Sequence, residues 1–448
     1  MIGKDAFQKI DLFLVIIITI TVIIGIVMIY SAGFDSFDRV NNGLYKKQMI
    51  WFILGFILMI GMTFINYQSL GDYALQIYIF LIVILLLTTL FGPKIKGARA
   101  WINLGIFSIQ PSEFMKIGLV IVLGKYLELR ERDIQNFREL IIPSLLTIIP
   151  MTIVLLQPDF GTAVIYIPIL FTMLFVGGAN ISHLVSVLLV ASIALIVPMI
   201  LTYQEWVYSV AKNSGKVIQE SNYILEFLKN TNKLFLVSGI LLFISIVAFV
   251  LHFFSTKKIL RKIYLPGFVF SLGLLSSVAI QNLFKEYQKK RILVFLNPEG
   301  LDPTRSGYQI IQSKIAIGSG GFFGKGFLKG TQSQLGFLPE KSSDFIFSVI
   351  AEEWGFFGSI IMIFLLAMII YRGIQISFEA KDKFGAILAS GITAIFFFHI
   401  VVNIGMAIGI MPVTGLPLCF VSYGGSNLFM SMIALGILIN IRTRKFLY

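Results

Sequence analysis

The chain has 448 residues, of which 57% are hydrophobic and only 13% are charged, with a formal net charge of +13 and a mean hydropathy of +0.89. Soluble globular proteins carry fewer apolar residues and about twice this share of charge, so the composition excludes that class and predicts an all-α polytopic membrane protein. The single cysteine, Cys419, excludes an intrachain disulfide. His183, His252 and His399 lie in separate apolar segments without metal-ligand spacing, which argues against a structural zinc site.

Apolar runs that span or nearly span a bilayer recur along the whole chain. The first, residues 12–30, follows Lys4 and Lys9 and is longer than the apolar core of a cleaved signal, so we interpret it as a retained anchor. The full set is 11–31, 48–66, 73–91, 112–126, 140–156, 161–178, 181–203, 234–254, 264–283, 345–371, 385–410 and 426–442. These runs predict about 10–12 transmembrane helices in a single integral membrane domain, residues 1–448, in which the pair around 157–161 is either two helices or one broken helix.

Basic residues in the short loops predict how the chain is oriented. If the helices alternate, the following all fall on one side: Lys4, Lys9, Arg130, Arg132, Arg138, Lys257, Lys258, Arg261, Lys262, Arg372, Lys381, Lys383, Arg442, Arg444 and Lys445. We expect that side, with both termini, to be cytoplasmic. Because most of the excess charge lies beside these spans, it does not indicate a nucleic-acid partner.

The same alternation makes residues 284–345 a large extracytoplasmic loop. It holds nine basic residues, five acidic residues and nine of the chain's 39 glycines. A basic surface at the outer membrane face suits an anionic headgroup such as a phosphate or pyrophosphate. A solvated loop with incidental lysines is the alternative interpretation.

Ionisable residues also occur inside the apolar runs, where each needs a partner or a purpose because insertion costs about 2.5–3.5 kcal/mol. Glu113 and Lys116 lie three residues apart, on one helix face and within reach of an ion pair. We expect this pair to hold helices together rather than to react with substrate. Asp344 starts an apolar helix in which Glu352 lies about 12 Å deeper, so Glu352 and Glu353 must face a partner, a polar cavity or a proton. Asp344 is also a candidate N-cap of that helix.

Within the loop, residues 297–303 (NPEGLDP) form a turn-rich segment, because proline fixes φ and glycine permits positive φ. The segment presents Asp302 near the membrane surface and is followed by Arg305. A carboxylate there can act as a general base while neighbouring cations stabilise a leaving pyrophosphate. An ordinary Asp-Pro turn is the other interpretation.

Four long motifs resemble the SEDS family, the shape, elongation, division and sporulation proteins. They are residues 96–116 (KGARAWINLGIFSIQPSEFMK), 157–163 (QPDFGTA), 295–355 (from FLNPEGLDP to IAEEWG) and 403–427 (NIGMAIGIMPVTGLPLCFVSYGGSN). The motifs are specific, occur in the family's order and extend from near the N-terminus to the end of the chain. The sequence GTQSQLGFLPEKSSDFIF is more similar to the family members of cell elongation than to those of division.

The resemblance implies a peptidoglycan glycosyltransferase that polymerises lipid II. The protein would lie in the cytoplasmic membrane, in contact with membrane lipids, and a class B penicillin-binding protein would be its partner. It implies that Asp302 is the essential loop aspartate and that Glu113 and Lys116 form the ion pair of a helix lining the active-site cavity. Further motif positions, in the outer loops, are Trp101, Arg305, Gln309, Gln312, Lys314, Gln334, Glu340 and Asp344. Of these we expect Trp101, Arg305, Gln309, Gln312 and Lys314, together with Arg99, to contact substrate, and Asp344 and Glu352 to line the cavity or pair within it.

Two departures from the family pattern stand out. Many members place arginine directly before the motif tryptophan, whereas Ala100 stands there and Arg99 precedes it. The family pattern also has about ten helices, and residues 204–263 look like an additional helical hairpin. An added pair of helices preserves the alternation and leaves the 284–345 loop outside.

The resemblance implies an inverting transfer with Asp302 as base and with Arg305, Lys314 and a possible divalent cation, Mg²⁺ or Mn²⁺, offsetting the charge of the departing pyrophosphate. Two other functions fit parts of the sequence. A lipid II flippase would use the buried charges and the break at 157–161 as a translocation path. A non-catalytic scaffold for a penicillin-binding protein would need none of the loop's chemistry.

Overall fold

The computed structural model describes residues 11–35, 40–41, 43–94, 98–103, 105, 108–213, 228, 230–255, 258–283, 294 and 306–445, and the structural statements below concern these residues. They form two compact units, Met1–Asn180 with Tyr308–Tyr448, and Ile181–Gly307. The first is called the main unit and the second the three-helix unit. The sequence predicts one integral membrane domain that includes both units, and this stays a prediction.

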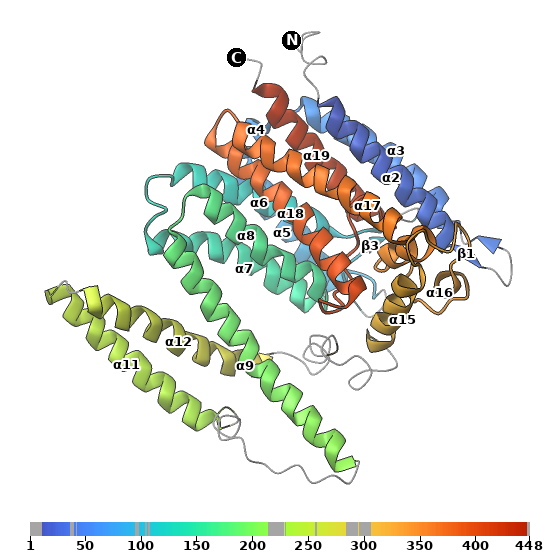
Figure 1. Cartoon of the computed structure of the whole chain (residues 1–448). Coiled ribbons are helices and arrows are strands. Elements are labelled where there is room, and N and C mark those ends of the chain that lie inside the picture. Colours follow the sequence, from blue (N-terminus) through green and yellow to red (C-terminus); the bar gives the residue numbers. More distant parts are fainter. Residues whose placement is uncertain are drawn as a thin grey trace. The chain divides into compact units, whose positions relative to one another are not determined.

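The main unit is built almost entirely from helices (Figure 1). Its long helices are α2 (Leu12–Ala32), α3 (Leu44–Phe64), α5 (Ala74–Phe91), α6 (Pro111–Leu129), α7 (Ile141–Leu156), α8 (Phe160–Gly177), α17 (Ile346–Glu379), α18 (Lys383–Ile408) and α19 (Gly425–Arg444). Shorter helices are α4 (Tyr67–Asp72), η1 (Phe137–Leu140), α15 (Ser306–Ser319) and α16 (Thr331–Gln334). Two antiparallel hairpins, β1 (Phe34–Asp35) with β2 (Val40–Asn41) and β3 (Ile102–Asn103) with β4 (Ser108–Ile109), complete it.

The three-helix unit consists of α9 (Ile181–Asn213), α11 (Thr231–Ser255) and α12 (Lys258–Leu283). Helix α12 packs against both others. Ser271 Oγ donates to Ser238 O at 2.8 Å, which joins α12 to α11. The expected hairpin at 204–263 therefore contains the end of α9, all of α11 and the start of α12, and its being additional to the family pattern stays a prediction.

The described residues confirm the predicted fold class and helix number. Eleven helices are long and apolar enough to cross a membrane, and α6 adds a charged helix of 19 residues at the remaining apolar run. The structure separates α7 from α8 at residues 157–159, so this pair is two helices and not one broken helix. Asp159 caps α8, because its Oδ1 accepts from Thr162 N at 3.2 Å.

The core of the main unit lies around α18, which contacts α6, α8, α17 and α19. Figure 1 shows α18 between α17 and α8. Helices α18 and α19 are the most buried of the spanning helices, whereas α3 and α5 expose most of their apolar side chains. Exposed leucine, isoleucine and phenylalanine on the outer helices are expected where lipid is the solvent.

Candidate functional site

A buried ion pair joins the start of α6 to the middle of α18. Lys116 Nζ lies 2.9 Å from Glu113 Oε2 and 2.8 Å from His399 Nε2. All three side chains are buried. The predicted Glu113–Lys116 pair is therefore confirmed, and His399 is its third member.

Local sequence places these groups. Pro111 occupies the first turn of α6, where its missing N–H costs nothing, and Glu113 lies in the same turn, at the positive end of the helix dipole. An ammonium can only donate, so His399 Nε2 accepts from Lys116 and the ring proton is on Nδ1, 3.2 Å from Pro417 O. The pair is thereby connected to residues 409–424, between α18 and α19.

Residues 409–424 also hold the end of the 284–345 loop in place. Asn403 Nδ2 donates to Asp344 O at 2.8 Å and to Leu416 O at 2.7 Å. Ser422 Oγ donates to Ser343 O at 2.5 Å. The last residues of the loop thus have backbone carbonyls fixed by α18 and by the segment that follows it.

The β3–β4 hairpin is attached to the same region. Gln110 Nε2 donates to Asp159 Oδ2 at 2.7 Å, which connects the start of α6 to the cap of α8. Gln110 N donates to Ser426 Oγ at 2.9 Å, and Ser426 Oγ donates to Ser108 O at 3.3 Å. Four segments far apart in sequence, which carry the four motifs, are therefore linked by side-chain hydrogen bonds at one end of the main unit.

Glu352 has a structural role in the loop. Its fully buried carboxylate accepts from Lys325 Nζ at 2.9 Å, Gln332 N at 2.8 Å, Ser333 N at 3.1 Å and Thr331 Oγ1 at 3.1 Å. A carboxylate at the first residues of α16 satisfies backbone donors that no intrahelical acceptor reaches. The expectation that Glu352 faces a partner is confirmed, and the partner is the loop itself.

Glu353, the next residue, joins the loop to α2. Its Oε1 accepts from Ser31 Oγ at 2.5 Å and from Gln334 Nε2 at 3.4 Å. Gln334 Nε2 also donates to Ser31 O at 3.0 Å. The two adjacent carboxylates therefore fasten residues 325–334 to α17 and α2.

One expectation about Asp344 is wrong. The N-cap position of α17 is occupied by Phe345, and no side chain there makes a capping hydrogen bond. Residues 341–345 instead form turns, in which Asp344 N donates to Glu340 O at 3.1 Å. Asp344 takes part in the site through its carbonyl, which Asn403 holds.

The predicted substrate-binding residues are placed as follows. Gln309 and Gln312 are half-buried on α15, and Lys314 is exposed on the same helix. The stem of Lys314 packs on Gly409, where an added Cβ would lie 2.1 Å from Lys314 Cε. Helix α15 is itself fixed by Ser313 Oγ, which donates to Ala407 O at 2.6 Å.

The remaining predicted substrate-binding residues lie outside α15, and two predicted site residues lie outside the described part of the chain. Arg99 is exposed, and its Nη1 donates to Leu90 O at 3.1 Å, near the end of α5. Trp101 is half-buried beside β3. Asp302 and Arg305, the predicted base and cation, lie outside the described residues.

Three buried polar atoms near the site have no hydrogen-bond partner within the described part of the chain: Ser112 Oγ, Asn403 Oδ1 and Thr414 Oγ1. An unpaired buried polar group costs about 1–3 kcal/mol, which pairing with water or with a polar group of a substrate would recover. Burial raises the pKa of the nearby Cys419 thiol to about 12, so this thiol is protonated and is not a nucleophile. Among residues the structure describes, no three His, Cys, Asp or Glu side chains form a metal cluster.

Sequence reasoning missed His399, Gln110 and Asn403. Each is a single polar residue at or near an apolar run, and each acts through a partner distant in sequence. The only available signal was the cost of burying such a residue unpaired.

The chain is similar over almost its whole length to one family of bacterial membrane proteins. It matches the cell cycle protein family of FtsW, RodA and SpoVE over residues 11–224 and 236–446. It is 37% identical to the peptidoglycan glycosyltransferase RodA of Treponema pallidum, over 94% of this chain and 95% of that protein. It is 32% identical to the peptidoglycan glycosyltransferase MrdB of Escherichia coli K12, over 95% and 93% of the two chains.

Solved structures agree with these relatives. The fold matches a chain of a peptidoglycan synthase complex that coordinates polymerization and crosslinking, with a TM-score of 0.65, 27% identity and 98% of both chains covered. It also matches the rod shape determining protein RodA of Thermus thermophilus, with a TM-score of 0.59, 25% identity and 98% of both chains covered.

Proposed function

Because the chain belongs to the cell cycle protein family of FtsW, RodA and SpoVE, we propose that it is a peptidoglycan glycosyltransferase that polymerises lipid II into glycan strands for cell elongation. The observation that carries this conclusion is the match, 37% identical and nearly end to end, to a relative named for that activity. Eleven candidate spans among the described helices make it a multi-pass membrane protein.

The geometry supports an active site at the end of the main unit where the four motifs meet. There the Lys116–His399 contact, the Gln110–Asp159 contact and the bonds from Asn403 to the loop end join α6, α8, α18 and the start of α17. Residues 297–305 precede α15, whose Ser313 is fixed to α18.

The proposed reaction is a single displacement with inversion. Asp302 takes the proton of the 4-hydroxyl of an incoming lipid II, the oxygen bonds to the anomeric carbon of the growing strand, and the bond from that carbon to the pyrophosphate breaks. Undecaprenyl pyrophosphate carries away the electron pair. An α-linked donor becomes a β-linked product in one step, so no covalent enzyme intermediate is needed.

Positive charge near the leaving group would lower the barrier, because charge develops on the pyrophosphate in the transition state. Lys314 is exposed on α15 and Arg305 directly precedes this helix, so both are candidates. Gln309 and Gln312 share that helix as polar contacts to the sugars. A divalent cation such as Mg²⁺ or Mn²⁺ would supply further positive charge at the pyrophosphate, although no three His, Cys, Asp or Glu side chains of the described residues form a cluster that would hold it.

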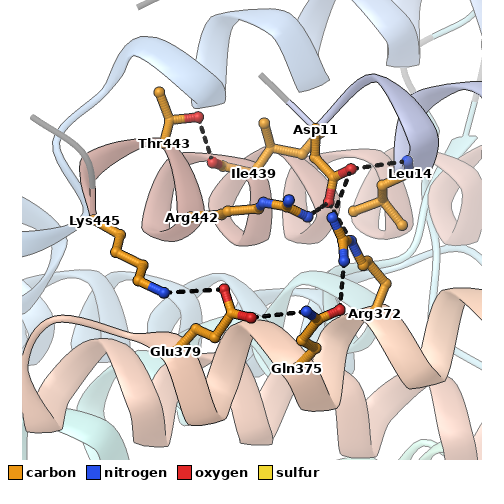
Figure 2. Close-up of polar contacts among 9 residues, drawn as sticks. All are labelled: Asp11, Leu14, Arg372, Gln375, Glu379, Ile439, Arg442, Thr443 and Lys445. Carbon is orange, nitrogen blue, oxygen red and sulfur yellow. Dashed lines mark hydrogen bonds and ion pairs between the residues drawn. The ribbon is translucent and has the colours of Figure 1, made fainter. Parts of the chain in front are cut away.

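We also propose that both termini are cytoplasmic. Asp11, at the start of α2, bonds to Arg372 near the end of α17 and to Arg442 near the end of α19, so these three helix ends lie at one face of the main unit (Figure 2). The basic residues Arg372, Arg442, Arg444 and Lys445 share that face, and the positive-inside rule makes it cytoplasmic. The loop before α17 is then on the outer side, where lipid II is polymerised.

A crosslinking penicillin-binding protein of class B is the proposed partner. The solved complex to which the fold is similar couples polymerization with crosslinking. Glycan strands need crosslinks to bear load, so a polymerase and a transpeptidase acting together fit the chemistry of the product.

The test is polymerisation of purified lipid II by the purified protein, alone and with a class B penicillin-binding protein. We expect glycan strands from the wild-type chain and none from Asp302→Ala, with the variant still inserted and folded. A normally active Asp302→Ala variant would contradict the base assignment. A flippase would move lipid II without polymerising it, and a scaffold would leave polymerisation to its partner whether or not Asp302 is present.

A further inference from the structure

Five exposed phenylalanines form a surface beside a break in α17. This aromatic surface consists of Phe322, Phe323, Phe327, Phe356 and Phe357, of which Phe323 is 78% exposed and Phe356 is 56% exposed. The ring of Phe322 lies 4.9 Å from that of Phe323 and 5.7 Å from that of Phe356. Three of the five belong to residues 320–327, which are not part of any spanning helix, so lipid-facing helix composition does not account for them.

The backbone holds this surface in place. Gly355 interrupts α17 with φ 67°, and the freed amides of Phe356 and Phe357 donate to Gly321 O at 2.9 Å and Phe322 O at 3.1 Å. Gly324 fits against the same turn, where an added Cβ would lie 2.1 Å from Glu353 O. The loop is therefore fixed at the height of the break.

Helix lengths show where this height lies in a membrane. Helix α17 has 34 residues, about 51 Å, which exceeds the roughly 30 Å of a hydrocarbon layer. Residues 356–379 alone span about 36 Å, enough to cross. The turns before Gly355 are buried inside the protein. A crossing by the part of α17 after Gly355 therefore places the break close to one boundary of the hydrocarbon layer.

A second measure comes from α2 and α3. Helix α2 has 21 residues, about 31 Å, so its length matches one bilayer crossing. Tyr30, near its end, stacks on Phe327 with ring centroids 6.4 Å apart and contacts Tyr45, near the start of α3, at 5.0 Å. Three helices therefore give the same level for the aromatic surface.

The chemistry of this level suits a membrane interface. Aromatic side chains concentrate where acyl chains meet headgroups. Lys46, Lys47 and Lys329 are exposed close to the same level, and the ammonium of Lys46 lies 5.9 Å from the centroid of the Tyr45 ring. Lysines in this position attract lipid phosphates.

We propose that the aromatic surface inserts into the headgroup and upper acyl region of the lipid leaflet and anchors residues 320–327, with the loop around them, to the membrane. That this leaflet is the outer one rests on the proposed function, whereas the insertion itself does not. An anchored loop keeps α15 at the height of a lipid-linked pyrophosphate, so the lipid bilayer becomes part of the positioning of the substrate.

Spin-label depth measurements test the insertion. Cys419→Ser removes the native thiol, and Phe323→Cys and Phe357→Cys give two separate label sites in nanodiscs of phosphatidylcholine with phosphatidylglycerol. Two reference sites calibrate the depth measurement. A label at Asp133→Cys, in an exposed turn, reports accessibility in water. A label at Phe364→Cys, which is exposed on α17 about 12 Å beyond Phe356, reports accessibility in the hydrocarbon layer. Accessibility to oxygen and to a water-soluble nickel complex is compared at all four.

We expect labels at 323 and 357 to fall between the two references, with oxygen accessibility at least twofold above the water reference. Labels as open to nickel as the Asp133→Cys label would overturn the proposal. Labels shielded from both reagents would also overturn it, in favour of a protein that covers the surface. Adding Asp302→Ala should leave the depth unchanged, so a failed polymerisation assay and a failed insertion are distinguishable.

A functional readout completes the test. The double variant Phe322→Ser, Phe323→Ser should fold, raise nickel accessibility of the label at 357 at least twofold, and raise the KM for lipid II in nanodiscs more than it lowers kcat. Unchanged depth in the double variant would contradict the proposal.

Discussion

Lys116 Nζ and His399 Nε2 lie 2.8 Å apart although 283 positions separate them in the chain. The same ammonium lies 2.9 Å from Glu113, and the other nitrogen of the imidazole faces Pro417 O at 3.2 Å. The imidazole therefore connects the buried ion pair of α6 to the segment that holds the end of the 284–345 loop.

Replacing His399 should remove the link between the Glu113–Lys116 ion pair and residues 409–424. His399→Leu removes the acceptor of Lys116 and the donor to Pro417 O, at a cost of about 1–3 kcal/mol for the buried groups left unpaired. We expect a lower unfolding temperature and a strong loss of lipid II polymerisation. His399→Gln keeps an acceptor and a donor in one side chain, so it should recover part of both. A leucine variant with wild-type activity would show that His399 does not position the pair.

Residues close in sequence or uniform in character were predictable, and contacts between distant segments were not. Glu113 and Lys116 lie three residues apart on one helix, so their pairing follows from helical geometry alone. Each apolar run falls on a long helix of the described residues, and eleven of these helices are candidate membrane spans, because a bilayer needs about 20 apolar residues for each crossing. His399 gave no such signal, since its partner lies in another helix.

The two buried glutamates illustrate a second limit. Their depth predicted that each needs a partner. It did not predict which partner: the four donors to Glu352 described above all come from residues 325–333, and two of them are backbone amides. Backbone amides are present at almost every residue, so the sequence does not mark which of them are used. The same holds for Asp344, where the carbonyl rather than the carboxylate makes the contact with Asn403.

Glu352 should control the order of the loop. Glu352→Gln keeps the size of the side chain but removes the charge that Lys325 and the amides of Gln332 and Ser333 share. Charge-assisted hydrogen bonds contribute about 1.5–3 kcal/mol, so amide exchange at 332 and 333 should rise at least tenfold, measured by hydrogen–deuterium exchange. Glu379→Gln, which removes a partly exposed carboxylate bonded to Gln375 and Lys445, is the matched control and should leave these amides unchanged. Equal exchange in both variants would contradict the role of Glu352.

The buried thiol of Cys419 should make the stability of the protein depend on pH. Burial raises its pKa from 9.0 to about 12, so the folded state favours the neutral thiol. This contribution to stability is complete below pH 9, where the unfolded thiol is also neutral, and is lost as pH rises from 9 towards 12. Thermal unfolding measured from pH 8 to pH 10.5 should therefore show a steeper decline for the wild type than for Cys419→Ala. At pH 8 a maleimide should label the thiol slowly in the folded protein and completely in denaturant. Rapid labelling of the folded chain would show that the thiol is accessible.

Asp11 should fasten three helix ends together at the face that we assign to the cytoplasm. Its buried carboxylate bonds to Arg372 and Arg442 and accepts from Leu14 N at the start of α2 (Figure 2). Asp11→Asn leaves the two guanidinium groups facing each other without a counter-charge, and we expect a loss of about 2 kcal/mol of stability, read from the unfolding midpoint in one detergent.

The matched control for Asp11 lies in the same cluster. Glu379 bonds to Lys445 at 3.2 Å, and both side chains are partly exposed, so Glu379→Gln should cost less than 1 kcal/mol. Adding Arg442→Gln to Asp11→Asn removes one of the two facing cations and should restore part of the lost stability. Raising the salt concentration should narrow the gap between the wild type and Asp11→Asn, because screening weakens the repulsion between the arginines. If the double variant is no more stable than Asp11→Asn alone, repulsion between Arg372 and Arg442 is not the cause of the loss. The weaker hydrogen bonds of a neutral amide to the two guanidinium groups are then the better explanation, because asparagine still caps α2.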